Sequence, residues 1–252
     1  MNIGKLIGIA TLLSPLVALA DDPPPQNVWT GKGQAGYVAS QGNAQSKSAN
    51  AAIDMGLIEG PWKHSFHLGG LYGESANVVA AERWDTGWQS DYSFTKDFFG
   101  FGALRYQHDM FSGFQYQASL TGGVGYNIFN SDDLKLSVQG GAGYRRLRPE
   151  LLTKDATGAV IARDPQDAQG SAIVTFGLNY AQNLSKTTTL TDKLLVEAGS
   201  GDTLITNALA LAVKMSTHFA LSVGYAIQDN TKPPAGLKKI DSIETLNLVY
   251  SF

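Results

Sequence analysis

The chain has 252 residues, of which 43% are hydrophobic and only 16% charged, with 28 glycines, no cysteine and a formal charge of −3. This composition argues against a disordered chain, a disulfide scaffold or cysteine-based metal site, and a nucleic-acid binder, which needs clustered Lys and Arg. A charge content this low also predicts that much of the outer surface does not face water.

The first segment has the pattern of a secretion signal. A short positive region (Met1–Lys5) is followed by an apolar run (Leu6–Leu19), and Ala18-Leu19-Ala20 fits a cleavage site with small residues. We expect a cleaved signal peptide over 1–20 and a periplasmic tail over 21–27. An uncleaved anchor is the alternative, but the run is shorter than the roughly 20 apolar residues that a spanning helix needs. The exported chain would then be either soluble or a membrane β-barrel, since only helices and closed barrels satisfy their backbone in lipid.

The rest of the chain alternates between apolar and polar residues with period 2. In Phe114–Ile128, for example, residues such as Phe114, Tyr116 and Leu120 share one face, and Gln115 and Gln117 share the other. Each segment of this kind is longer than the five or six residues typical of soluble strands and long enough for a tilted strand to cross a bilayer. Twelve such strands are expected, at 28–40, 45–58, 62–73, 82–94, 98–109, 113–128, 134–147, 170–182, 188–199, 203–215, 218–229 and 241–252.

The connections between these strands alternate in kind. One edge has only tight turns, at 59–61, 95–97, 129–133, 183–187 and 216–217. The opposite edge carries the connections at 41–44, 74–81, 110–112, 148–169, 200–202 and 230–240; two of these are short, but all the long connections fall on this edge. Outer-membrane barrels have short periplasmic turns and longer external loops, so the sequence predicts a single closed antiparallel transmembrane β-barrel, all-β, of about 12 strands over residues 28–252.

Aromatic residues gather near both ends of the expected strands, as in the two girdles of membrane barrels. The periplasmic set comprises Trp29, Trp62, Tyr92, Phe94, Phe98, Tyr126, Tyr180, Phe219, Tyr250 and Phe252. The outer set comprises Tyr37, Tyr72, Trp84, Tyr106, Phe114, Tyr116, Tyr144 and Tyr225. The core of a soluble β-protein would instead place its aromatics in mid-strand. The last strand alternates up to a terminal Phe, and it is similar to the C-terminal strand that the barrel-insertion machinery reads; the residues concerned are Leu246, Leu248, Tyr250 and Phe252.

The whole arrangement resembles a family of uncharacterised bacterial outer-membrane β-barrels, labelled "salt-induced outer membrane protein", whose domain has no known function. The resemblance covers nearly all of the mature chain and implies fold and location in a Gram-negative outer membrane more firmly than activity. It implies no catalytic residues. The matching stretches are Trp29-Thr30-Gly31, Ser40-Gln41-Gly42-Asn43, Arg105 through Asp109-Met110-Phe111-Ser112 to Gly123-Val124-Gly125-Tyr126, Gly141-Ala142-Gly143-Tyr144-Arg145, and Tyr250-Ser251-Phe252.

Charged residues in the inward phase of the strands are the candidate functional residues. Rings of Lys and Arg favour anions, so these residues predict a narrow, mildly anion-selective pore; cross-strand ion pairs that plug the barrel are the alternative. A barrel of twelve strands is intermediate in width between barrels that are filled by side chains and barrels with a clear channel. Strand number therefore does not distinguish a pore from a plugged barrel. The candidate residues are Lys32, Asp54, Lys63, Arg83, Asp85, Asp91, Arg105, Lys135, Arg145, Lys193, Glu197 and, at a strand end, Lys214.

The four histidines offer little catalytic chemistry. His108 is predicted to face outward near the outer rim, close in sequence to Asp109 and Ser112, which leaves a lipid hydrolase with a Ser–His pair as the alternative function. The simpler interpretation of His108 is a histidine at the membrane interface, and His64 is interpreted in the same way. His67 points inward and His218 lies at a turn, and neither has a second ligand at a metal-binding spacing. We therefore expect no metal and no cofactor.

The sequence thus predicts a non-enzymatic envelope protein, either a narrow passive pore for small solutes and ions or a structural barrel. A role under osmotic or salt stress comes from the family resemblance alone. The expected partners are outer-membrane lipid, lipopolysaccharide and the barrel-insertion machinery, with no nucleic acid. The long segment Arg148–Gln169 is expected to be a loop that folds inward as a constriction, lies on lipopolysaccharide, or is simply solvated.

Overall fold

The computed structural model describes residues 28–252 except 41–44, 77, 157–159 and 235. The predicted signal peptide and periplasmic tail therefore lie outside the described residues. Within this part of the chain, no helix is long and apolar enough to cross a membrane.

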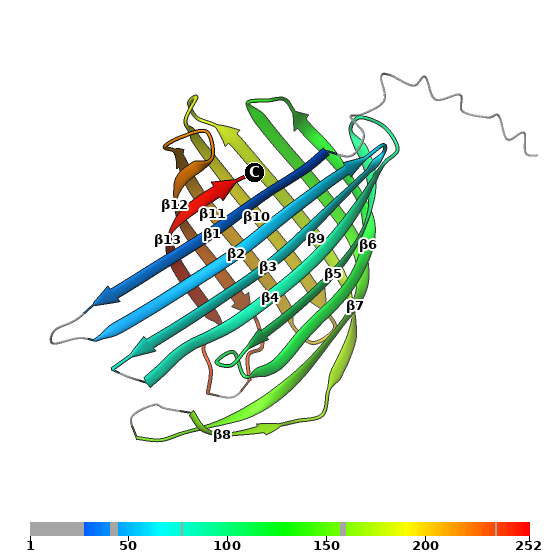
Figure 1. The fold of residues 1–252 in the computed structure, drawn as a ribbon. Helices are drawn as coiled ribbons and strands as arrows, with labels where there is room; N and C mark the ends of the chain where they lie inside the picture. Colours follow the sequence, from blue (N-terminus) through cyan, green and yellow to red (C-terminus); the bar gives the residue numbers. More distant parts are fainter. Residues whose placement is uncertain (1–27, 41–44, 77, 157–159, 235) are drawn as a thin grey trace, which may run out of the picture.

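The described residues form long antiparallel strands at nearly the predicted positions (Figure 1). Alternation of apolar and polar residues produces them, because successive side chains of a strand point to opposite faces of the sheet. The strands are β1 (Val28–Ser40), β2 (Ser46–Glu59), β3 (Trp62–Ser75), β4 (Val78–Ser93), β5 (Phe98–Asp109), β6 (Phe114–Asn130), β7 (Leu134–Lys154), β8 (Val160–Pro165), β9 (Gln169–Asn183), β10 (Thr188–Gly199), β11 (Thr203–Lys214), β12 (Phe219–Asn230) and β13 (Ile240–Ser251).

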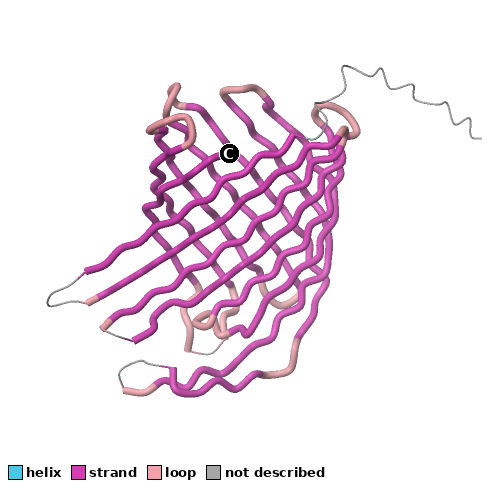
Figure 2. Tube along the Cα trace, viewed as in Figure 1, coloured by secondary structure: helices cyan, strands magenta, loops and turns pink. Residues whose placement is uncertain are grey.

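Twelve of these strands close into one barrel, and the prediction of a closed antiparallel transmembrane barrel is confirmed. Each strand pairs with its neighbours in sequence, β7 pairs with β9, and β1 pairs with β13 to complete the circle. β8 lies outside the wall and pairs only with the end of β7. Figure 2 shows the tilted strands running around an enclosed interior.

The closing seam between β1 and β13 is short. Its register has four residue pairs, from Lys32 with Ser251 to Ala35 with Leu248, whereas β1 and β2 pair over 13 positions. Two backbone hydrogen bonds between Gly31 and Phe252, of 3.0 and 2.9 Å, extend the seam. The ring of Phe252 covers Gly31, so a Cβ at this position would displace the ring.

The two faces of the wall have the polarity of a membrane barrel. Alternate residues such as Leu120, Val174 and Val223 are exposed on the outside, as an apolar surface solvated by lipid requires. The intervening residues on the inside include most of the buried polar side chains, among them Ser119 and Gln228. This arrangement is the inverse of a soluble protein and follows directly from the phase of the sequence alternation.

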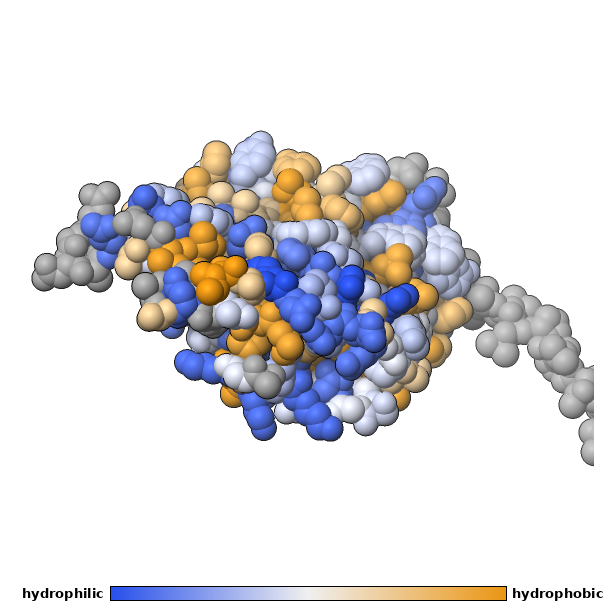
Figure 3. Space-filling view, turned by 90° about the horizontal axis from the view of Figure 1, so that it is seen from below, coloured by the Kyte–Doolittle hydropathy of each residue, from blue (hydrophilic) through white to orange (hydrophobic). Residues whose placement is uncertain are grey.

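The connections divide the barrel into two ends. The tight-turn end carries the short turns at 60–61, 94–97, 131–133, 184–187 and 215–218, together with the C-terminus. The long-loop end carries the remaining connections and the β7–β8 hairpin (Figure 1). Seen from the long-loop end, hydrophilic surface gathers over the middle of the molecule, with hydrophobic patches beside it (Figure 3).

Three details of the prediction need correction. The segment expected as a loop over Arg148–Gln169 largely continues as strand, because β7 runs to Lys154 and turns back into β8. The connection expected over Glu74–Ala81 is mostly strand as well. Phe114, expected in the outer girdle, is only 5% exposed, because a register shift between Phe114 and Tyr116 turns it out of the outward phase.

Candidate functional site in the barrel lumen

The strand register places the predicted charged residues on the inner face of the wall. Lys32 lies opposite Asp54, Asp54 opposite His67, and the row continues through Gly87 to Arg105 on β5. From Arg105 it passes to Ser119 and Arg145, still on the same face. The same phase holds for the other members of the set, which are Lys63, Arg83, Asp85, Asp91, Lys135, Lys193, Glu197 and Lys214.

An ion-pair chain runs along the inner face of β1 to β4. Lys32 Nζ lies 3.3 Å from Asp54 Oδ2, and Asp54 Oδ1 lies 2.7 Å from His67 Nδ1. The other ring nitrogen, His67 Nε2, lies 3.1 Å from Asp85 Oδ2, and Asp85 Oδ1 lies 3.6 Å from Arg83 Nη2. An imidazolium ring donates from both nitrogens, so two carboxylates can hold His67 between them.

Gly69 leaves room for this bridge. A Cβ at Gly69 would lie 3.0 Å from His67 Nε2 and 3.5 Å from Asp85 Oδ1, so a side chain there would crowd the ring. The side chains of the ion-pair chain are 25–46% exposed although they lie inside the wall. Space large enough for water therefore lies beside this row in the interior.

Lysines on opposite walls of the barrel face the interior beside the ion-pair chain. Lys193 on β10 interacts electrostatically with Asp54, Lys32 and Lys63. Lys63 stands on β3, six strands from β10 around the barrel, through β2, β1, β13, β12 and β11. The three lysines thus place positive charge around the interior toward the tight-turn end, with Asp54 and Asp91 as nearby carboxylates.

A second polar cluster, the lumen bridge (Arg105, Ser119, Arg145, Glu197 and Asp202), fills the other side of the interior. Ser119 donates a 2.8 Å hydrogen bond to Glu197 Oε1, and Arg105 Nη1 lies 3.8 Å from the same oxygen. Arg145 pairs with Asp202 and donates to the backbone carbonyl of Glu197 at 3.4 Å. Arg145 is 1% exposed, whereas Arg105 is 40% exposed, so only Arg105 faces the accessible space.

One contact crosses the full width of the lumen. Gln107 Nε2 on β5 donates to Gln228 Oε1 on β12 at 3.1 Å. Six steps separate these strands in either direction around the barrel, so they stand on opposite walls. The connections above them also meet, because a Cβ at Gly113 would lie 2.9 Å from Pro234 Cγ. The interior is therefore narrowed at the long-loop end.

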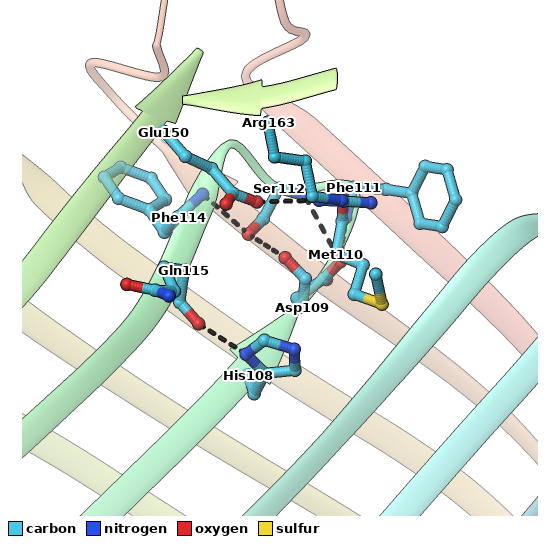
Figure 4. A network of polar contacts seen from close by, with 9 residues as sticks. All are labelled: His108, Asp109, Met110, Phe111, Ser112, Phe114, Gln115, Glu150 and Arg163. Atoms are coloured by element: carbon cyan, nitrogen blue, oxygen red, sulfur yellow. Dashed lines mark hydrogen bonds and ion pairs between the residues drawn. The ribbon is translucent and has the colours of Figure 1, made fainter. Parts of the chain in front are cut away.

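The β7–β8 hairpin is fastened to the turn after β5, as Figure 4 shows. Arg163 Nη1 lies 2.7 Å from Glu150 Oε1 and also donates to the backbone carbonyl of Met110. The Arg163 guanidinium lies 5.8 Å from the centre of the Phe111 ring, which adds a cation–π contact. These contacts therefore join the β7–β8 hairpin to the turn after β5 at the long-loop end of the barrel.

The remaining candidates lie outside these clusters. Asp91 accepts a 2.8 Å hydrogen bond from Gln89, which also donates to Gln139 at 3.2 Å. Lys135 is exposed near the tight-turn end. Among the described residues, no group of three or more His, Asp or Glu is placed to hold a metal ion.

The structure does not assemble a catalytic group at His108. Its Nδ1 contacts the backbone carbonyl of Gln115, whereas the Ser112 hydroxyl donates to the backbone carbonyl of Asp109 at 2.9 Å (Figure 4). The Asp109 carboxylate accepts from the backbone N–H groups of Phe111 and Ser112, as in an Asx turn. These three side chains therefore shape a turn.

Reasoning from sequence missed the bridging role of His67, which it placed correctly inside the barrel. The signal was available in the strand phase. His67 lies directly opposite Asp54 and diagonal to Asp85, the two positions at which cross-strand side chains interact.

A closed wall of twelve antiparallel strands, apolar outside and charged inside, defines a β-barrel of the outer-membrane type. The chain belongs to the family described as "Protein of unknown function, DUF481", which matches residues 33–252. It is 26% identical over 238 residues to the "Uncharacterized protein YdiY" of Escherichia coli K12, covering 92% of this chain and 86% of that protein.

Solved structures that are similar to this chain include a translocator domain and an outer membrane channel. The translocator domain of the autotransporter NalP from Neisseria meningitidis has a TM-score of 0.47 and 14% identity, covering 90% of this chain and 87% of that domain. An outer membrane channel from Pseudomonas putida F1 has a TM-score of 0.48 and 9% identity, covering 96% and 100%. The names of the family and of the Escherichia coli relative do not mention salt, so the predicted stress role stays a prediction.

Proposed function

We propose that the protein is a narrow passive pore of the outer membrane, which passes small ions and prefers anions. The observation that carries this proposal is the exposure of the ion-pair chain: Lys32, Asp54, His67, Asp85 and Arg83 are 25–46% exposed inside a closed wall. Charges are expensive to desolvate, so water surrounds this row. Charged side chains that line a water-filled lumen set its ion selectivity.

The path runs beside β1 to β4, because the lumen bridge fills the opposite side. Lys32, Lys63 and Lys193 attract anions at the tight-turn end. The 3.1 Å hydrogen bond between Gln107 and Gln228 crosses the lumen and narrows it. A solute therefore passes beside this contact, which restricts the pore to small ions.

Single-channel recording in planar bilayers tests the proposal. The protein is expected to give small discrete conductance steps, and Gln107→Gly with Gln228→Gly is expected to enlarge them by removing the crossing. Gln182→Ala is the matched control, because Gln182 faces outward in the register with Leu134 and Leu190. Absence of conductance in both the wild type and the double variant would refute the pore and leave a structural barrel.

We further propose two partners and a setting. Arg146 is exposed on the outer wall beside Tyr144, in position to meet lipopolysaccharide phosphates. Leu246, Leu248, Tyr250 and Phe252 present the closing strand to the insertion machinery. The setting is osmotic or salt stress, where a small ion pore adjusts the periplasm; it is tested by comparing growth of a deletion strain in high and low salt.

A further inference from the structure

The outer wall is hollowed close to the tight-turn end. The wall groove lies over β3, β4 and β5, with a volume of about 1060 Å³. Its sides include Trp62, Trp88 and Tyr92, and its floor includes Gly100 and Gly102. A Cβ added at Gly102 would meet no heavy atom within 4 Å, so the floor is open space.

A polar pair stands among the aromatic residues of the groove, which Glu59 also lines. Ser90 Oγ lies 2.9 Å from His64 Nδ1, and both residues line the groove. The imidazole stacks with Trp62 (5.9 Å between ring centres, 6° between planes) and with Trp88 (6.3 Å, 16°). The aromatic rings therefore fix the orientation of His64.

The pair keeps one polar hydrogen unused in either neutral tautomer. If the Ser90 hydroxyl donates to Nδ1, the Nε2–H of His64 remains; if Nδ1–H donates to Ser90, the serine O–H remains. In the described part of the chain, no acceptor takes this remaining hydrogen. A donor without a partner is costly in an apolar medium, so the site fits a ligand that brings an oxygen acceptor.

The depth of His64 and Ser90 in the membrane indicates which lipid group can accept this hydrogen bond. Trp62 and Tyr92 pack edge to face at 4.9 Å in the aromatic rim, which lies at the level of lipid headgroups. His64 lies two residues further along β3, about 6.6 Å along the strand and about 5 Å deeper at a tilt of roughly 45°. Acyl ester carbonyls lie at this depth, and the lipid chains run onward from them along the wall.

We propose that the wall groove binds one acyl chain of a diacyl phospholipid from the leaflet at the tight-turn end. The ester carbonyl of that chain accepts the remaining hydrogen of the His64–Ser90 pair. The proposal depends on the transmembrane fold and is independent of pore activity. Nucleophilic catalysis needs a third group to orient the base; here the aromatic faces of Trp62 and Trp88 hold His64, so the pair is a binding element.

Photolabelling in vesicles tests this binding. The full chain is reconstituted in phosphatidylethanolamine and phosphatidylglycerol, with a small fraction of phosphatidylethanolamine that carries a diazirine in one acyl chain. After irradiation, peptide mass spectrometry is expected to find adducts concentrated on β3 to β5 at the groove. Competition by ester-linked phospholipid is expected to exceed that by its ether-linked analogue about fivefold, the value of one hydrogen bond.

Matched variants make the result decisive. Gly102→Trp fills the groove and is expected to remove most of the groove adducts. Gly33→Trp is the control, because Gly33 also faces outward and an added Cβ there meets nothing within 4 Å. The combined change of His64→Phe and Ser90→Ala is expected to lower labelling about fivefold.

Heat-dependent gel mobility confirms that each variant has folded. Uniform labelling of the outer wall, or labelling unchanged in Gly102→Trp, would overturn the proposal. Equal competition by the ether-linked lipid would overturn the role of the ester carbonyl. Cross-links between two chains at the groove, in place of lipid adducts, would show that a second copy is the occupant and would also overturn it.

Discussion

Arg105 and Arg145 stand in the same inner row with Ser119 between them, and the structure predicts different consequences for their loss. Arg105 is 40% exposed and Arg145 1% exposed. Arg145 pairs with Asp202 and donates to the carbonyl of Glu197, whereas Arg105 has one long contact, 3.8 Å, with Glu197. We therefore expect Arg105→Gln to change ion selectivity and Arg145→Gln to change stability.

The two magnitudes can be estimated separately. For an ion passing about 6 Å from Arg105 in the dielectric of water, the Coulomb energy is ~0.7 kcal/mol, which alters the local anion concentration about threefold at low salt. Removing one partner of a buried ion pair costs about 3–5 kcal/mol. Because Asp202 keeps some exposure, at 16%, the free energy of unfolding should fall by ~3 kcal/mol in Arg145→Gln.

Reversal potentials under a salt gradient measure the first effect, and urea unfolding followed by tryptophan fluorescence measures the second. Screening should shrink the shift of Arg105→Gln as salt rises, since the Debye length is about 10 Å at 0.1 M and 3 Å at 1 M. A selectivity change in folded Arg145→Gln equal to that in Arg105→Gln would refute the division of the lumen into an accessible and a filled side.

Three further outcomes are expected. In His67→Leu, the carboxylates of Asp54 and Asp85 lose the imidazole ring that lies between them. The free energy of unfolding, measured by urea titration, should fall by ~1–2 kcal/mol, which is less than for a buried pair because the side chains are 29–39% exposed. An unchanged midpoint of unfolding would contradict the bridge. Cysteines at Ala35 and Leu248, in a chain without other cysteines, should form a disulfide across the short seam. Oxidation should raise the free energy of unfolding by at most ~5 kcal/mol by the loop-entropy relation. Failure of the disulfide to form in the folded protein would contradict the register of β1 with β13. Phe252→Ala should lower the amount of assembled barrel in cells. The free energy of unfolding of the refolded protein should change by less than ~1 kcal/mol, because Phe252 is 65% exposed. An unchanged amount of assembled barrel would contradict recognition of the terminal strand.

The positions of the strands and the faces of their side chains could be predicted because apolar and polar residues alternate along every strand of a membrane barrel. The alternation over Phe114–Ile128 needs only local information, and the register follows where the phase is unbroken, as between β1 and β2. A bulge breaks the phase without a sequence signal of its own. For that reason Phe114 was placed on the wrong face.

Contacts across the lumen could not be predicted from the same rule. The pairing of Gln107 with Gln228 depends on closure of all twelve strands, because these residues are 121 positions apart in sequence. The hairpin of β7 and β8 could not be predicted because Leu151 and Leu152 are adjacent and break the alternation at the end of β7. His64 and Ser90 become a pair only when β3 and β4 are in register.

The central claim is that one face of each strand meets hydrocarbon and the other an enclosed polar interior. Spin labels on single cysteines along β3, at residues 65 to 70, test it most directly in proteoliposomes, because a lipid-soluble and a water-soluble relaxation agent report on the two environments. Access of oxygen should peak at Phe66, Leu68 and Gly70, and access of a nickel chelate at Ser65, His67 and Gly69. Equal access of both agents at all six positions, or alternation in the opposite phase, would contradict the account.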